Sequence, residues 1–136
     1  MTNEELKSKL ADIAQTHRVS VEFDSPQVRK NEGASAGSDE IMLGEFDETT
    51  ILVAAFFHEL GHCLAKNQHN IRIENEIRCW KIGFEAMVAN GFEIKNSQIM
   101  FCLECLAGYA EYEYREYTES ALLRLKSQIK EKLNSN

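Results

Sequence analysis

Two histidines and a glutamate lie close together in the segment FFHELGHCL, inside an otherwise apolar run. His58 and His62 are four residues apart, so on a helix both imidazoles lie on one face and can bind one metal ion. Glu59 is about 100° further round such a helix, where its carboxylate lies beside the ion and can accept a proton from bound water. The HExxH spacing therefore predicts two zinc ligands and a catalytic general base on one helical turn.

The residues around this motif differ in size between the two sides of the predicted helix. Those near the histidine face are small, namely Ala54, Ala55, Gly61 and Ala65. Those on the opposite side are bulkier, namely Leu52, Phe56, Leu60 and Cys63. We expect the bulkier side to be buried and the small residues to leave room for a metal ion and a substrate. The alternative is an amphipathic helix that carries histidines without any chemical role.

A catalytic zinc site has three protein ligands and a water molecule, so a third ligand is expected downstream. The longer pattern HExxHxxGxxH requires glycine at position 65 and histidine at position 68. This chain has Ala65 and Gln68 instead, so that pattern is not met. The remaining candidates are His69, Glu74 and Glu76.

The two glutamates differ in their position on the next predicted helix. Its apolar stripe is formed by Ile73, Ile77, Trp80, Phe84 and Met87. Glu76 lies about 60° from the centre of this stripe and Glu74 about 100° away, four residues before Arg78 in the order that stabilises an exposed pair. We therefore predict Glu76 as the third ligand and keep Glu74 and His69 as alternatives. The alternative for all three residues is that they belong to a solvated, charged helix face and bind no metal ion.

The HELGH motif, followed by Glu76-Ile77-Arg78-Cys79-Trp80, resembles the ImmA/IrrE-type metallopeptidases. In that family HExxH is followed by a glutamate with a small residue, usually alanine, three places later, where this chain has Cys79. The segment EIMLG just ahead of the motif is similar to the edge strand of that minimal zincin fold. The resemblance covers roughly residues 19–91.

The resemblance implies a Zn²⁺-dependent peptidase, in which zinc polarises the scissile carbonyl and Glu59 passes a proton from water to the leaving amine. It also implies a specific protein substrate, such as a transcriptional repressor. One alternative is a non-catalytic zinc-binding interaction protein that keeps the zincin fold, although the intact Glu59 favours an enzyme. Another is a zinc hydrolase of a non-peptide amide. A site of two histidines and a glutamate suits zinc best but also accepts other divalent ions.

The elements that must position these residues follow an α+β pattern. We expect helices at about residues 3–16, 49–67, 71–90, 97–113 and 120–133, strands at about 19–23 and 40–44, and a loop over 24–39. Thr2 and Glu5 form a capping box for the first helix, and Asp47 or Thr49 is expected to cap the HELGH helix. The sequence predicts one helix-rich, zincin-like domain over residues 1–136, with its core at 19–91, C-terminal helices at 97–133, and a small antiparallel sheet.

The composition narrows the choice of partner and compartment. The net charge is −7 and there is no basic run, so direct nucleic acid binding is not expected and the partner should be a protein or peptide. The N-terminal segment has no apolar signal region and no window is long enough to span a bilayer, which predicts a cytoplasmic location without membrane contact. The cysteines are expected to be reduced and packed as small apolar residues, including the CxxC pair Cys102 and Cys105.

Stabilisation of a transition-state oxyanion requires a further donor, typically Tyr, His or Arg. The sequence does not select among the candidates, which are His17, His69, Arg78, Tyr109, Tyr112, Tyr114 and Tyr117.

Overall fold

The structure of the protein is a computed structural model that describes residues 1–65, 72–110, 127 and 131. Its elements in chain order are α1 (Asn3–Thr16), β1 (Ser20–Glu22), β2 (Gly33–Ala36), β3 (Glu40–Leu43), α2 (Thr49–Leu64), α3 (Arg72–Ala89) and α4 (Asn96–Ala110). The helix predicted at 120–133 and the predicted ends of two others, at 66–67 and 111–113, lie outside the described residues except for positions 127 and 131. The described part is α+β and rich in helix, as predicted.

The sheet has three strands in the order β1-β3-β2 and is mixed rather than antiparallel. β1 runs parallel to β3, with Ser20 opposite Glu40, and β2 runs antiparallel to β3. The prediction of an antiparallel sheet was therefore wrong. The physical reason is the segment between β1 and β3, which is long enough to carry the chain back to the starting end of β1, as a parallel pair requires.

The strand β2 was not predicted, because its sequence GASA lacks the apolar alternation of a half-buried strand. Packing instead requires a small residue at its first position, Gly33. A Cβ atom on Gly33 would lie 2.8 Å from the Leu43 side chain and 3.1 Å from Cγ of Glu59. The absence of a side chain at Gly33 thus lets this outer strand lie directly against the glutamate of the HExxH motif.

The predicted cap Thr2 is confirmed for α1, whereas the caps predicted for α2 were wrong. Thr2 caps α1, accepting a hydrogen bond from the backbone N–H of Glu5 at 3.1 Å. The N-cap of α2 is Glu48, which makes no capping hydrogen bond through its side chain. Asp47 instead forms an ion pair with Lys30 at 2.8 Å and accepts a hydrogen bond from the Asn31 side chain at 3.1 Å. Asp47 therefore fixes the loop that leads into β2.

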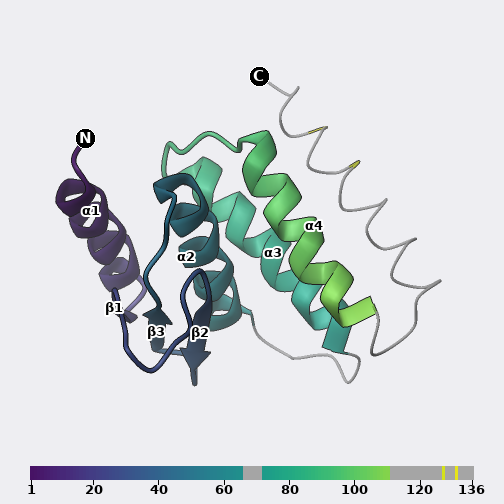
Figure 1. The fold of residues 1–136 in the computed structure, drawn as a ribbon, viewed down its shortest axis with the longest axis horizontal. Coiled ribbons are helices and arrows are strands. Elements are labelled where there is room, and N and C mark those ends of the chain that lie inside the picture. The colour runs from purple at the N-terminus through teal and green to yellow at the C-terminus, as the bar shows by residue number, and fades with distance from the viewer. Residues whose placement is uncertain (66–71, 111–126, 128–130, 132–136) are drawn as a thin grey trace.

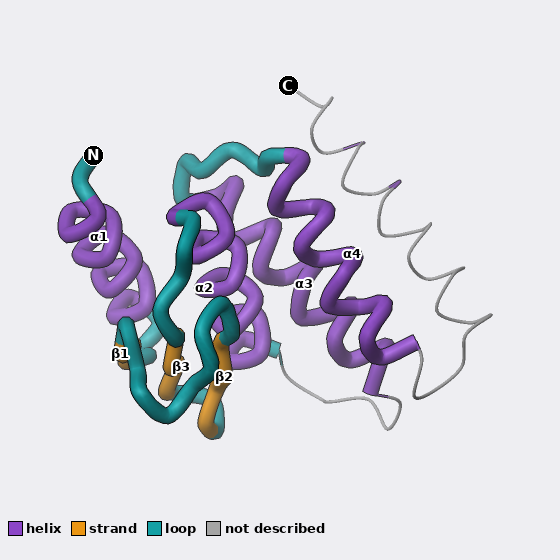
Figure 2. Tube along the Cα trace, viewed as in Figure 1, coloured by secondary structure: helices purple, strands orange, loops and turns teal. Residues whose placement is uncertain are grey.

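Helix α2 lies at the centre of the described fold, with the sheet on one side and α3 and α4 on the other (Figures 1 and 2). The bulkier residues of α2 are buried as predicted, and so are most of its small ones. Gly61 does not leave space for a substrate: a Cβ atom there would lie 2.1 Å from the carbonyl oxygen of Cys79. A Cβ atom on Gly83 would likewise lie 2.4 Å from the carbonyl oxygen of Phe57. These two glycines let α2 and α3 pack with their backbones in close contact.

Candidate metal centre

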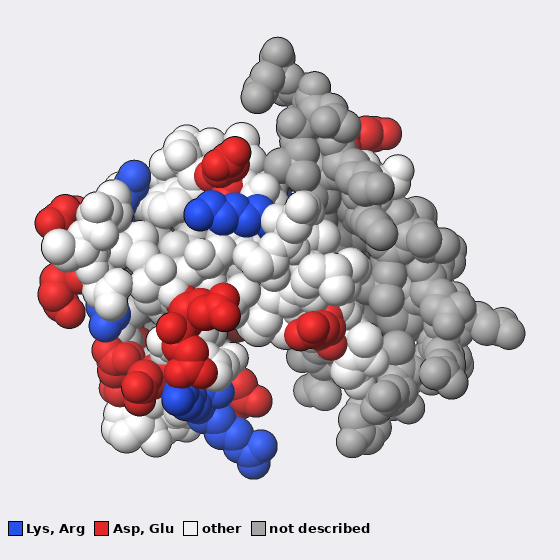
Figure 3. All heavy atoms as spheres, turned by 45° about the horizontal axis from the view of Figure 1, so that its top comes forward, with Lys and Arg blue, Asp and Glu red and all other residues white. Residues whose placement is uncertain are grey.

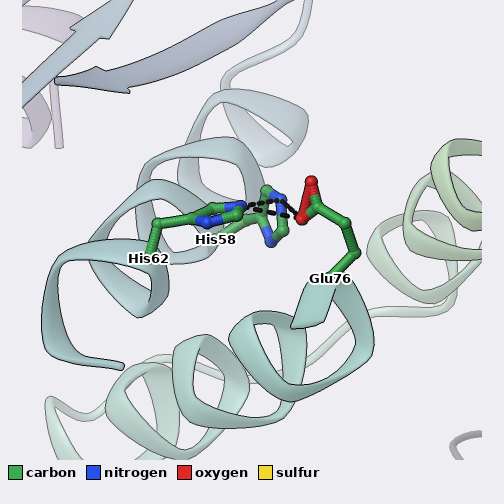
Figure 4. A group of neighbouring side chains, drawn as sticks. All are labelled: His58, His62 and Glu76. Atoms are coloured by element: carbon green, nitrogen blue, oxygen red, sulfur yellow. Dashed lines mark hydrogen bonds and ion pairs between the residues drawn. The ribbon is translucent and has the colours of Figure 1, made fainter. Parts of the chain in front are cut away.

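Helices α2 and α3 bring His58, His62 and Glu76 together, with their side chains pointing toward one another (Figure 4). Oε2 of Glu76 lies 2.7 Å from Nε2 of His62 and 3.3 Å from Nε2 of His58. The two Nε2 atoms lie 3.2 Å apart. Three potential ligand atoms from two helices thus converge on one point, and the group can hold a metal ion.

The separations of these atoms fit a tetrahedral ion. Ligands at about 2.0–2.1 Å from a tetrahedral zinc ion lie about 3.3 Å from one another. Two of the three separations, 3.2 Å and 3.3 Å, agree with this value. The third, at 2.7 Å, is the length of a direct hydrogen bond between His62 and the carboxylate. Two nitrogens and a carboxylate oxygen are also a donor set that suits a divalent transition metal.

The candidates for the third ligand that the structure describes lie in different surroundings. Glu76 is buried, with 8% of its surface exposed, and belongs to the group. Glu74, two residues earlier on α3, is half-buried and does not belong to it. His69 lies outside the described residues. The expected burial of Glu76 at the edge of the apolar stripe agrees with this arrangement, whereas Glu74 is half-buried rather than solvated as expected.

The electrostatics of the group follow from burial and from mutual contact. Burial alone would raise the pKa of Glu76, but hydrogen bonds from His58 and His62 hold that pKa well below its usual range. Burial lowers the pKa of His62, but hydrogen bonding to Cys79 and Glu76 outweighs it and raises the pKa to about 10. The two helices therefore place a carboxylate anion between two imidazoles.

Glu59 lies near the candidate metal group, which is formed by His58, His62 and Glu76, but does not belong to it. Its side chain turns toward β2, where it lies close to Gly33. Burial is the main cause that raises the pKa of Glu59, against the opposing effect of His58 and His62. A buried carboxylate with a raised pKa beside a metal site is suited to accept and return a proton.

A cavity of about 500 Å³ opens over the metal group and Glu59. The start of β2 and the residue pair before it form one wall, and α4 contributes Phe101, Glu104 and Cys105 to another. Of the four small residues of α2 that were expected to leave room for a substrate, Ala55 lines this cavity. The cavity therefore connects the candidate ligands, the candidate base and the outer strand of the sheet.

Two neighbours of the histidines were not predicted as part of the site. The Trp80 ring stacks on the His58 ring, with centroids 4.1 Å apart and planes 18° from parallel. Sγ of Cys79 lies 3.3 Å from Nδ1 of His62. From the sequence, Trp80 is expected only as part of the apolar stripe, and Cys79 only as a small residue. Their positions three and four residues after Glu76, on the same side of α3, were the available signal.

The remaining candidates from the sequence that the structure describes do not belong to the group of potential metal ligands. All four cysteines are free, and Cys102 is fully buried as expected, whereas Cys105 is half-buried beside the cavity. Burial raises the pKa of both thiols. His17 is exposed directly after α1. Among the other oxyanion candidates, Tyr112, Tyr114 and Tyr117 lie outside the described residues.

No protein-family profile, curated protein or solved structure matches this chain. None of the helices in the described part of the chain combines the length and the apolar character needed to cross a membrane.

Proposed function

We propose that the protein is a zinc-dependent metallopeptidase with a zincin-like active site. The observation that carries this proposal is the convergence of His58, His62 and Glu76, with Glu59 beside them in one cavity. Three protein ligands and a neighbouring carboxylate are the donor set of a catalytic zinc site rather than a structural one, which usually has four protein ligands. The HELGH motif and the Glu76–Cys79 spacing support the same assignment through their resemblance to ImmA/IrrE-type peptidases.

The residues of the proposed site have different roles in the reaction. His58, His62 and Glu76 hold the ion, which when bound polarises a carbonyl group and acidifies a water molecule. Glu59 accepts the proton from the attacking water and returns it to the leaving amine. Gly33 lets the Glu59 side chain lie against β2 at the wall of the cavity, because a Cβ atom there would lie 3.1 Å from Cγ of Glu59.

The surroundings of the cavity favour an extended peptide as the substrate. β2 is an outer strand of the sheet, and its first residue, Gly33, lines the cavity. A peptide can add to such a strand through main-chain hydrogen bonds, which would place its carbonyl groups near the metal group. The resemblance further suggests that this peptide belongs to a specific protein, such as a transcriptional regulator in the cytoplasm.

The charge of the protein disfavours nucleic acid as a direct partner. The chain has a net charge of −7, and the exposed residues Glu32 and Glu104 line the cavity. Acidic side chains also lie on both sides of the hollow in the face shown in Figure 3. A polyphosphate would be repelled from such a surface.

Metal content tests the proposal without knowledge of the substrate. Purified wild-type protein and the variants Glu76→Ala and Glu74→Ala are compared by mass spectrometry of bound metals. We expect about one zinc ion per chain in the wild type and in Glu74→Ala, and loss of zinc in Glu76→Ala. A wild-type protein that takes up no zinc when it is supplied would overturn the proposed function. Loss of zinc in Glu74→Ala alone would overturn the assignment of the third ligand.

A further inference from the structure

We propose that Cys79 is a positioning residue for the metal centre, whose thiol orients the imidazole of His62. This inference rests on the proposed metal site and adds to it a residue that does not bind the ion. Its basis is the 3.3 Å contact between Sγ of Cys79 and Nδ1 of His62.

The two nitrogens of the His62 ring have different neighbours. Nε2 faces Glu76 at 2.7 Å and His58 at 3.2 Å, so it is the atom directed at the centre. Nδ1 is then the nitrogen that is left to make a hydrogen bond on the other side of the ring. A histidine that binds a metal through Nε2 carries its proton on Nδ1, and the partner of that N–H fixes both the tautomer and the ring orientation. The thiol sulfur of Cys79 is the acceptor in that place.

The thiol is held firmly enough to act in this way. Cys79 is buried, with 1% of its surface exposed, so water does not compete for the contact. Its carbonyl group packs against Gly61, on the same turn of α2 as His62. Cys79 also follows Glu76 by three residues on α3, so one turn of α3 carries both a ligand and the residue that orients another ligand.

His58 shows that this arrangement is specific to His62. Nδ1 of His58 is buried and has no hydrogen-bond partner among the described residues. The ring of His58 is restrained by its stack on Trp80 instead. The two rings are therefore oriented by different means, and among the described residues only Nδ1 of His62 has a side-chain hydrogen-bond partner.

Direct ligation by Cys79 is not what the geometry indicates. Its sulfur lies at Nδ1 of His62, whereas the atoms that converge on the centre are the two Nε2 atoms and Oε2 of Glu76. Cys79 does not belong to the group of potential ligands in the described part of the chain. A partner at the distal nitrogen is a position from which a side chain orients a ligand without touching the ion.

The zinc affinities of Cys79→Ala, Cys79→Ser and Cys102→Ala, measured by competition with a chromogenic chelator, test this inference. Loss of a residue that orients a metal ligand typically weakens binding by 10–100-fold, so we expect Cys79→Ala to bind zinc at least about tenfold more weakly. Cys79→Ser keeps an acceptor and should retain most of the affinity. Cys102→Ala removes another buried thiol, away from the histidines, and should bind like the wild type. Equal affinities for Cys79→Ala and wild type would overturn the inference but not the proposed function.

Cobalt substitution separates an orienting role from direct ligation. We expect the wild-type Co²⁺ protein to lack thiolate-to-cobalt absorption in the near ultraviolet, and its visible bands to shift in Cys79→Ala as His62 changes orientation. A thiolate band that disappears in Cys79→Ala would make Cys79 a ligand and overturn the inference. Failure of the wild type to bind either zinc or cobalt would overturn the proposed function, and the inference with it.

Discussion

At the scale of single residues, the HExxH turn divides its side chains between two directions. His58 and His62 face α3 and Glu76, whereas Glu59 lies close to Gly33 of β2. The offset of about 100° between neighbouring residues on a helix accounts for this division. The same turn thus presents metal ligands on one side and a proton acceptor on the other.

Replacement of Glu59 by Gln tests the role of the base separately from metal binding. The amide cannot accept the proton from water, so we expect hydrolysis to fall by roughly 10²–10⁴-fold, the usual contribution of a general base. Zinc content should stay at the wild-type level because Glu59 is not a ligand. The measurement compares cleavage of a peptide library, followed by mass spectrometry, with the metal content of the same samples.

A Glu59→Gln protein that cleaves peptides like the wild type would remove Glu59 from the mechanism. If the wild type binds zinc but neither it nor the variant cleaves any peptide or candidate regulator, the non-catalytic zinc-binding protein becomes the better explanation.

Much of the candidate site was predictable at this scale, because it depends on spacing along one helix. The HExxH spacing alone indicated His58, Glu59 and His62, and the apolar stripe of α3 selected Glu76 over Glu74. The contacts of Cys79 and Trp80 were not predictable, since they depend on the rotation of two imidazole rings between packed helices. Periodicity places a residue on a face but does not determine which ring atom its side chain meets.

At the scale of elements, the centre depends on how closely α2 approaches α3. The ligands come from both helices, and Gly61 and Gly83 bring the two backbones into contact. The prediction that Gly61 leaves room for a substrate was wrong, because the small size of a residue does not reveal whether a ligand or another helix fills the space beside it. The parallel pairing of β1 with β3 was missed for a similar reason, since strand direction depends on the path of the connecting loop.

Substitution of Gly61 by Ala tests this helix contact. The added methyl group would meet the backbone of Cys79, which cannot move like a flexible side chain, so we expect a loss of stability of about 1–3 kcal/mol. The matched control is Gly108→Ala in α4, where a Cβ atom would have none of the described residues within 4 Å. That change should stabilise the protein by up to about 1 kcal/mol, because alanine is the better helix former. Chemical denaturation measures both, and equal effects would contradict the close contact.

At the scale of the whole molecule, a bound ion would act as a cross-link between α2 and α3. The ligands His58 and Glu76 belong to different helices, and α2 also packs on the sheet and on α4. An ion that binds only the folded chain shifts the folding equilibrium in proportion to its occupancy. The stability of the described core should therefore depend on metal.

Thermal unfolding with and without zinc tests this coupling. Free zinc at a hundredfold excess over Kd adds about 2.7 kcal/mol of stability, which for a chain of this size raises Tm by roughly 10 °C. A chelator should reverse the shift, and Glu76→Ala should not show it. His17→Ala, which removes an exposed histidine outside the centre, should show the full shift. A shift that persists in Glu76→Ala would indicate that zinc stabilises the protein from another site.

The stack of Trp80 on His58 gives the protein an optical property of its own. Trp80 is the only tryptophan of the chain, and its ring lies 4.1 Å from a candidate metal ligand. Every photon of tryptophan fluorescence therefore originates next to the centre. Occupancy of the centre can be followed in unlabelled protein by fluorescence, and a quenching ion such as Cu²⁺ or Co²⁺ would report its own arrival in a rapid-mixing experiment.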